Sequence, residues 1–189
     1  QDGPAIPTNG STPPDNLYDI RDGLLTPDDK PISGIVLELR YTLSGEAVDL
    51  SETLLGGSGA YQVVTDGNGY YVFSGLMGNQ NYTVIEVHPE GYFDSKDTPG
   101  TTTGLAVNVG TLISPLVIDR FAAQGVSFQF DALLQIPLAI GQHSQLNNFS
   151  EVQTFQIILP PEDPPPEDPP PPNFIPPPPR FIAPPPQIF

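Results

Sequence analysis

Proline is concentrated at one end of this chain, and its distribution limits what each part can fold into. Of the 26 prolines among 189 residues, 16 lie in the last thirty, from Pro160 to Phe189. Proline has a fixed φ and no amide hydrogen, so such a segment is expected to adopt polyproline II and not helix or sheet. We therefore predict an exposed leader at 1–16, a folded domain at 17–159 and a Pro-rich tail at 160–189.

The charge balance excludes several classes of protein. The chain has 22 acidic against 6 basic residues, a net charge of −16 and a pI of about 4.1. Nucleic-acid phosphates and anionic membrane surfaces require a basic face, so we expect neither as a partner. The chain has no cysteine, which excludes disulfides, thiolate catalysis and sulfur-ligated metals.

Short apolar runs with a period of two predict an all-β domain, a β-sandwich. Gly, Pro, Asn or Asp separate the runs, and Asp66-Gly-Asn-Gly69 is typical of a hairpin turn. The predicted strands are 35–39, 61–65 and 70–73 on either side of that turn, 82–87, 105–109, 116–118, 126–130 and 152–159.

Two further expectations concern the second half of the domain. No stretch of ten or more residues has helical periodicity, so almost no helix is expected. The apolar segment Ala132–Ile140 is interrupted by Pro137, which favours an edge strand or a crossing loop over a central strand.

The middle of the chain carries a motif that resembles a known family. Residues 65–92 follow the pattern T-D-x-x-G-x-Y-x-F-x-x-L, then Y-x-V-x-E and P-x-G-Y. This pattern is similar to that of collagen-adhesin B-type and serine-aspartate-repeat B-type (CnaB-like) domains of bacterial surface proteins. The resemblance covers roughly 17–131 and implies a prealbumin-like, immunoglobulin-like Greek-key sandwich. Its matching residues are Thr65, Asp66, Gly69, Tyr71, Phe73, Leu76, Tyr82, Val84, Glu86, Pro89, Gly91 and Tyr92.

The resemblance also implies two candidate sites. Many collagen-adhesin B-type domains form a Lys–Asn isopeptide bond beside a buried Glu, and Glu86 occupies that position. The lysines are Lys30 and Lys96, neither of them in the expected first strand, so a hydrogen-bonded Glu86 is the alternative. Serine-aspartate-repeat domains carry a calcium loop where this chain has an acidic group, for which a solvated acidic turn is the alternative. That group is Asp15, Asp19, Asp22, Asp28 and Asp29.

The sequence does not favour an enzyme. The two histidines are His88, just before Pro89, and His143, in a polar stretch. Neither has a partner that the sequence makes visible, and no phosphate-binding or zinc-protease motif is present. A His–carboxylate cluster in a cleft would change this interpretation.

Three sequons and the absence of an initiating Met favour an extracellular, processed protein. The sequons begin at Asn9, Asn81 and Asn148, and each is a candidate glycosylation site. The first residue is Gln1, and no apolar run approaches the length of a membrane span.

The tail repeats apolar anchors at an interval of seven residues. A polyproline II rod of thirty residues reaches roughly 90 Å, and regular apolar side chains on it favour docking into a groove. We therefore predict a structural subunit of an extracellular fibre, in which each tail binds the next copy head to tail. The expected anchors are Phe174, Ile175, Phe181, Ile182, Ile188 and Phe189.

Two other functions remain open. The tail is also compatible with a glycosylated or wall-spanning stalk. The domain would then be an adhesin that binds a glycan or host protein through its polar loops at 51–59 and 98–104.

Overall fold

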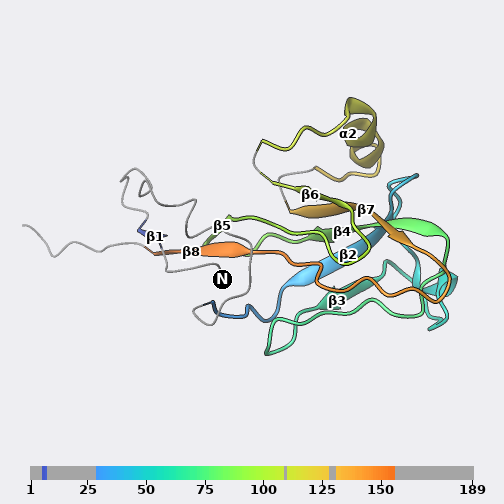
Figure 1. The fold of residues 1–189 in the computed structure, drawn as a ribbon, viewed down its shortest axis with the longest axis horizontal. Helices are drawn as coiled ribbons and strands as arrows, with labels where there is room; N and C mark the ends of the chain where they lie inside the picture. Colours follow the sequence, from blue (N-terminus) through green and yellow to red (C-terminus); the bar gives the residue numbers. More distant parts are fainter. Residues whose placement is uncertain (1–5, 8–28, 109, 128–130, 156–189) are drawn as a thin grey trace, which may run out of the picture. The chain divides into compact units, whose positions relative to one another are not determined.

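The regular structure of the described residues is mostly antiparallel β-sheet with few helices, in agreement with the predicted all-β class (Figure 1). The computed structural model describes residues 6–7, 29–108, 110–127 and 131–155. Its elements are β1 (Ile6–Pro7), β2 (Val36–Tyr41), the 3-10 helix η1 (Leu50–Glu52), β3 (Gln62–Val64), β4 (Gln80–Glu86), β5 (Tyr92–Asp94), β6 (Leu105–Val107), α2 (Pro115–Ala122), β7 (Ala132–Leu138) and β8 (Glu151–Phe155).

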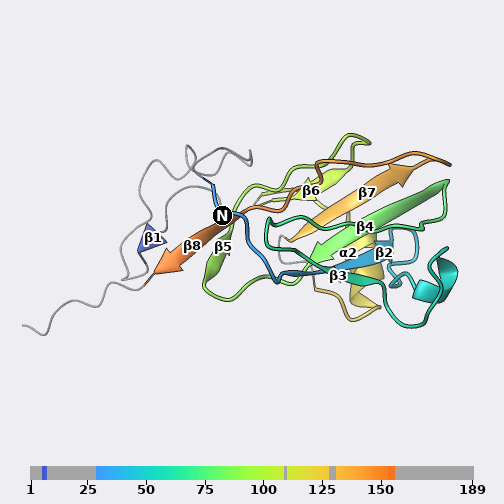
Figure 2. The ribbon, with the colours of Figure 1, turned by 90° about the horizontal axis from the view of Figure 1, so that it is seen from below.

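The strands form two sheets. A five-stranded sheet has the order β3-β2-β4-β7-β6, and a three-stranded sheet has the order β1-β8-β5. All pairs are antiparallel except β1 with β8, which is parallel. Figure 2 shows β5 and β8 beyond one end of the five-stranded sheet, the end at which β4 finishes and β7 begins.

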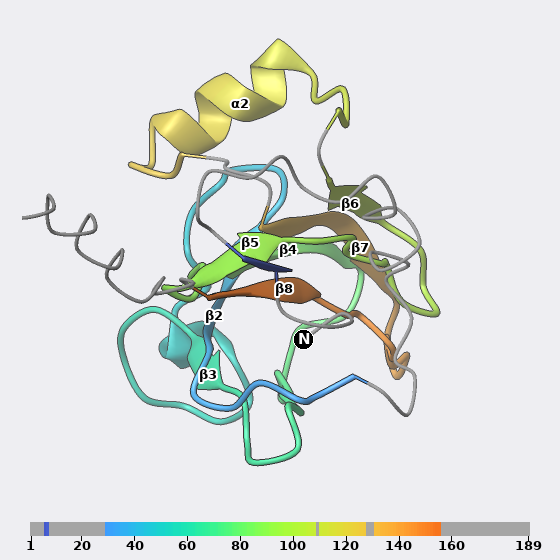
Figure 3. The same ribbon diagram turned by 90° about the vertical axis from the view of Figure 1, so that its left-hand side faces the viewer.

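The five-stranded sheet is covered on both faces. On one face, Leu37, Leu39 and Leu133 are buried with Tyr61 and Tyr82. On the other face lie Val107, Ala132 and Leu134, against which Val117 of α2 packs. Successive residues of β7 thus face opposite sides, and Figure 3 shows α2 over one face of the sheet.

The motif residues of the middle segment have structural roles. Thr65 Oγ1 donates to the carbonyl of Ile32 at 2.8 Å and accepts from the amide of Ile35 at 3.0 Å. The Asp66 carboxylate accepts the amides of Asn68 and Tyr70 at 2.8 and 3.0 Å, which forms the predicted turn.

The sequence predicts a hairpin of strands 61–65 and 70–73 around this turn, and the second of these strands is wrong. Residues 70–73 do not pair as a strand, and β3 pairs with β2 instead. Tyr71 and Phe73 nevertheless pack against the core that contains Tyr82 and Val84, as expected, because the loop lays both rings on the sheet.

The segment 116–118, predicted as a strand, is part of the helix α2. Pro115 at the first helical position has a φ suited to a helix start, and Gly125 has a φ of +75° just beyond its end. Phe121 is fully buried and Val117 packs one turn before it. The spacing of four residues makes α2 amphipathic and corrects the strand predicted at 116–118, while the small helical content of the described residues agrees with the expectation of almost no helix.

The segment 132–140 is also corrected, because β7 lies inside the sheet. It pairs with β4 on one side and with β6 on the other. The last pair with β6 is Leu105 with Leu134, so Pro137 is paired only with β4, opposite Asn81. A strand can contain proline at a position where no neighbouring strand is hydrogen-bonded to one of its edges.

Several predictions lie outside the described residues. These are the start of the domain at 17–28, the polyproline II tail, parts of the strands predicted at 126–130 and 152–159, and the leader apart from Ile6–Pro7, which form β1. Among the residues that the structure describes, no helix combines the length and apolar character required to cross a bilayer.

Candidate functional site

The site lies where the end of β4 meets the start of β7. The two strands run antiparallel with Ile85 opposite Ala132, so the residues that follow one lie beside those that precede the other. The amide of Glu86 donates to the carbonyl of Asp131 at 2.9 Å. His88 and Asp131 are therefore neighbours.

The second sheet adds carboxylates to the same place. β8 begins at Glu151, which pairs with Asp94 at the end of β5. Asp97 follows β5, and its Oδ1 accepts the amide of Ser150 at 3.1 Å. Four carboxyl groups thus lie near Glu151, and two of the five, Asp131 and Glu151, contact the imidazole of His88; the other three are Glu86, Asp94 and Asp97.

The imidazole of His88 has a defined orientation. Its Nε2 lies 3.0 Å from the carbonyl oxygen of Tyr92, which can only accept, so Nε2 carries the hydrogen. Its Nδ1 lies 3.3 Å from Oδ1 of Asp131 and 3.5 Å from Oε1 of Glu151. A neutral His88 therefore directs a lone pair between two carboxylates.

The carboxylates are buried, which disfavours their charged forms. Loss of hydration, together with repulsion from the neighbouring acids, raises the pKa of Glu86 to about 8, of Asp97 to about 9 and of Glu151 to about 10. Burial also raises the pKa of Asp131, although the adjacent His88 opposes this. The cluster therefore holds protons near neutral pH unless another cation replaces them.

Two carboxylate oxygens in the cluster have unused acceptor capacity. Oδ2 of Asp97 and Oε2 of Glu151 are buried and have no hydrogen-bond donor among the described residues. Such groups are rare in folded proteins and indicate either bound protons or an ion.

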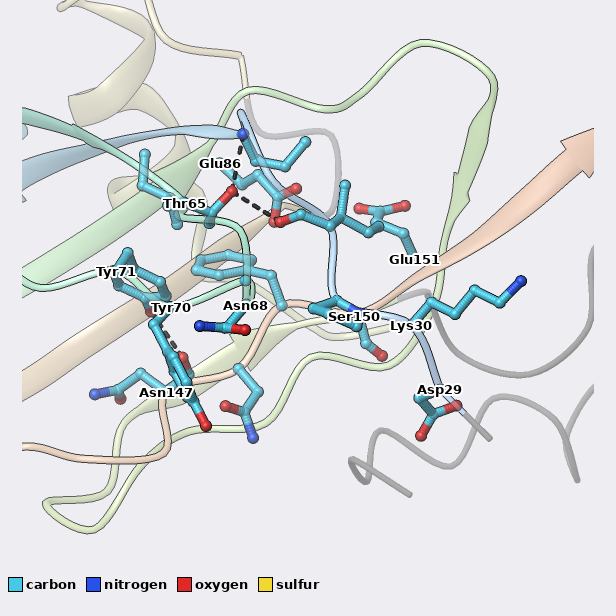
Figure 4. A pocket seen from close by; sticks show the side chains of 17 residues that line it. Asp29, Lys30, Thr65, Asn68, Tyr70, Tyr71, Glu86, Asn147, Ser150 and Glu151 are labelled. Carbon is cyan, nitrogen blue, oxygen red and sulfur yellow. Dashed lines mark hydrogen bonds between the residues drawn. The ribbon is translucent and has the colours of Figure 1, made fainter. Parts of the chain in front are cut away.

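A pocket of about 150 Å³ adjoins the cluster (Figure 4). The carboxyl groups of Glu86 and Glu151 lie toward one end, and Tyr70, Tyr71 and Asn147 line the other. The hydroxyl of Tyr71 donates to the carbonyl of Asn147 at 2.7 Å. One end of the pocket is therefore acidic and the other aromatic.

Two of the residues considered for an isopeptide bond lie around this pocket. Glu86 and Lys30 line it, whereas Lys96 does not. Figure 4 shows the ammonium end of Lys30 directed away from the carboxyl group of Glu86. Glu86 is buried, as its position in the motif predicts.

The structure places the other candidates separately. Asn81 is exposed on β4, whereas the threonine of its sequon, Thr83, is fully buried and hydrogen-bonded to Thr42. Asn148 is half-buried and His143 is exposed. Of the calcium candidates, Asp29 lines the pocket. Asp19, Asp22, Asp28, Asn9 and all six apolar anchors of the tail lie outside the described residues.

The two loops proposed for ligand binding differ. Loop 98–104 is tied to 144–148, with backbone hydrogen bonds in both directions between Thr98 and Asn148. Loop 51–59 begins with η1, capped by Asp49, and exposes Leu54 and Leu55.

Sequence reasoning considered His88 but missed Asp131 and Glu151. A signal was present, because an antiparallel pairing of 132–138 with 80–86 would have placed Asp131 beside His88. Pro137 hides this signal, because a proline in the segment favours an edge strand or a loop over a strand paired on both sides.

The comparisons with known proteins give no family assignment. The chain matches no protein-family model, no curated protein and no solved structure. The resemblance to collagen-adhesin B-type domains therefore rests on the motif of residues 65–92 alone.

Proposed function

We propose that this protein is a non-enzymatic, structural subunit of an extracellular bacterial fibre that assembles head to tail through its Pro-rich tail. The observation that carries the proposal is the repeat of apolar pairs at an interval of seven residues after an acidic, cysteine-free β-domain. We further propose that the domain is a Greek-key sandwich of the prealbumin type and that the tail is polyproline II.

The pocket is a suitable receptor for an apolar anchor of the next copy. Polyproline segments dock onto aromatic surfaces because the rod is already ordered and loses little entropy on binding. The pocket is lined by Tyr70, Tyr71 and Phe149, and Tyr70 is 67% exposed. Arg180, which precedes the anchor Phe181, would find acidic groups near the same pocket.

A structural role agrees better than catalysis with the burial of the carboxylates. The side chains of Glu151 and Asp131 are only 3% and 11% exposed. A substrate would have to reach these groups, whereas a proton or a small ion can be enclosed with them.

Electron microscopy of the full chain and of a chain that ends at residue 172 tests assembly. We expect filaments from the full chain and single particles from the shortened one. Phe174→Ser with Phe181→Ser should weaken assembly similarly, whereas the polar control Asn173→Ser with Gln187→Ser should not. Equal assembly of all four proteins would refute the proposal.

A second set of variants locates the receptor. Tyr70→Ser should weaken assembly as much as the anchor variants, because it removes an exposed ring from the pocket without disturbing the core. Val72→Ser, an exposed residue nearby that does not line the pocket, is the control. Assembly that depends on the anchors but not on Tyr70 would place the receptor elsewhere.

An adhesin, with the tail as its stalk, is the second candidate. It is favoured by the exposed leucines of loop 51–59, since adjacent exposed apolar side chains are common at binding surfaces. Loss of glycan or host-protein binding after exchange of this loop, with the oligomeric state unchanged, would support it.

A further inference from the structure

We propose that His88, Asp131 and Glu151 bind one divalent transition-metal ion of the zinc type. The three residues come from the end of β4, the start of β7 and the start of β8, so the ion would fasten the two sheets together. This inference does not depend on the tail.

The spacing of the donor atoms fits such an ion. Ligands at about 2.0–2.1 Å from zinc in a tetrahedral site lie roughly 3.3–3.5 Å from one another. Nδ1 of His88 lies 3.3 Å from Oδ1 of Asp131 and 3.5 Å from Oε1 of Glu151, and the three atoms lie within 4.8 Å of one another. If the carboxylate oxygens of Asp131 and Glu151 moved slightly closer to each other, the three donor atoms would occupy three of the four positions of a tetrahedral site.

The second contact of His88 is the one that metal-binding histidines commonly make. A ligating imidazole usually donates its other N–H to a carbonyl or carboxylate, which fixes the tautomer and the ring plane. Here the carbonyl of Tyr92 accepts from Nε2. The nitrogen that faces the carboxylates is consequently the one with the free lone pair.

The unpartnered oxygen of Glu151 is independent evidence for a cation. Glu151 is almost fully buried, and its Oε2 has no hydrogen-bond donor among the described residues. A buried, ionised carboxylate is costly unless its charge is balanced. His88, whose Nδ1 lies 3.5 Å from Oε1, balances at most one carboxylate, whereas a divalent ion would balance both Asp131 and Glu151. The nearby Glu86, Asp94 and Asp97 add negative potential that attracts a cation.

The donor set selects the class of ion. Calcium and magnesium prefer six or more oxygen ligands, whereas one imidazole with two carboxylates suits zinc and its first-row neighbours. His88 is 36% exposed, so an ion can enter from solvent and a water molecule can occupy the fourth position.

Calorimetric titration of the chelator-treated full chain with zinc tests the proposal. We expect one ion per chain, and Co²⁺ in its place should give the visible absorption of a four-coordinate complex. His88→Gln and Glu151→Gln should each weaken zinc binding at least tenfold and abolish the Co²⁺ spectrum. The matched control is His143→Gln, which removes an exposed imidazole outside the cluster and should leave both readouts unchanged.

His88→Gln is the decisive variant because it keeps an amide donor for Tyr92 at a half-exposed position, and circular dichroism checks its fold. Absence of zinc binding by the wild-type chain would overturn the proposal. Unchanged affinity in folded His88→Gln, or binding of calcium in preference to zinc, would overturn it as well.

Discussion

At the scale of single residues, burial raises the pKa of several carboxyl groups of the domain. Asp97 shows this most clearly because it is almost completely buried and its Oδ2 has no donor in the described part of the chain. The groups that face it are Asp94, Glu86 and Asp131, all acidic, and the amide of Ser150. Burial and these neighbours together raise the pKa of Asp97 to about 9.

The first prediction is that Asp97→Asn reduces the pH dependence of stability. An unfolded Asp has a pKa of about 3.9, so between pH 4 and 9 the folded chain binds a proton that the unfolded chain releases. The free energy of unfolding therefore falls as pH rises through this range, and Asn removes that contribution. Thermal unfolding in chelator should show Asp97→Asn to be more stable than wild type at pH 8 and similar at pH 4.

The control for this prediction is Asp119→Asn, which removes an exposed carboxylate on α2. It should leave the pH profile of wild type unchanged. Parallel profiles for wild type and Asp97→Asn would show that Asp97 is ionised in the folded chain, contrary to the prediction.

At the scale of elements, period-two patterns and turn residues were sufficient for β2, β3, β4 and β6, although burial alternates only along β2 and β3. They failed for α2 because three adjacent apolar residues in a short run are compatible with either a strand or a helix. The helix is decided by tertiary contacts. Val117 packs on the sheet, and Arg120 Nη1 donates to the carbonyl of Thr42 at 2.9 Å.

Pro137 exposes a second limit of sequence reasoning. Proline is normally absent from strands that are hydrogen-bonded on both sides. Pro137 is tolerated in β7 because β6 is too short to pair with it, and the sequence does not specify the length of β6. The candidate site was missed for the same reason, since Asp131 reaches His88 only through the pairing of β7 with β4.

The second prediction concerns the contribution of α2 to stability. Phe121 is fully buried, so Phe121→Ala should lower the free energy of unfolding by about 3–5 kcal/mol through lost burial and a cavity. Leu116→Ala, on the exposed side of the same helix, should change it by less than about 0.5 kcal/mol. Chemical denaturation measures both, and equal effects would show that α2 does not pack on the sheet.

At the scale of the whole molecule, the net charge of −16 opposes the association of identical subunits. Any assembly must overcome this repulsion through apolar contacts, which the anchors of the tail provide in the proposed fibre. Added salt screens the repulsion and leaves apolar contacts intact.

The third prediction is therefore that assembly strengthens as salt rises. Between about 0.01 and 0.15 M ionic strength the screening length falls from about 30 to 8 Å. Light scattering should show a lower critical concentration for filaments at the higher salt. A critical concentration that rises with salt would mean that ion pairs, such as those available to Arg180, dominate the joint.

The parallel pairing of β1 with β8 determines how the domain would respond to tension. Ile6 lies opposite Thr154 and Pro7 opposite Phe155, and β8 leads directly toward the Pro-rich segment. Force applied to the N-terminal side of β1 and the C-terminal side of β8 acts along two strands that run in the same direction. Such a force shears the pair, so the hydrogen bonds between β1 and β8 bear the load together. A force that peeled the strands apart would instead break these bonds one after another.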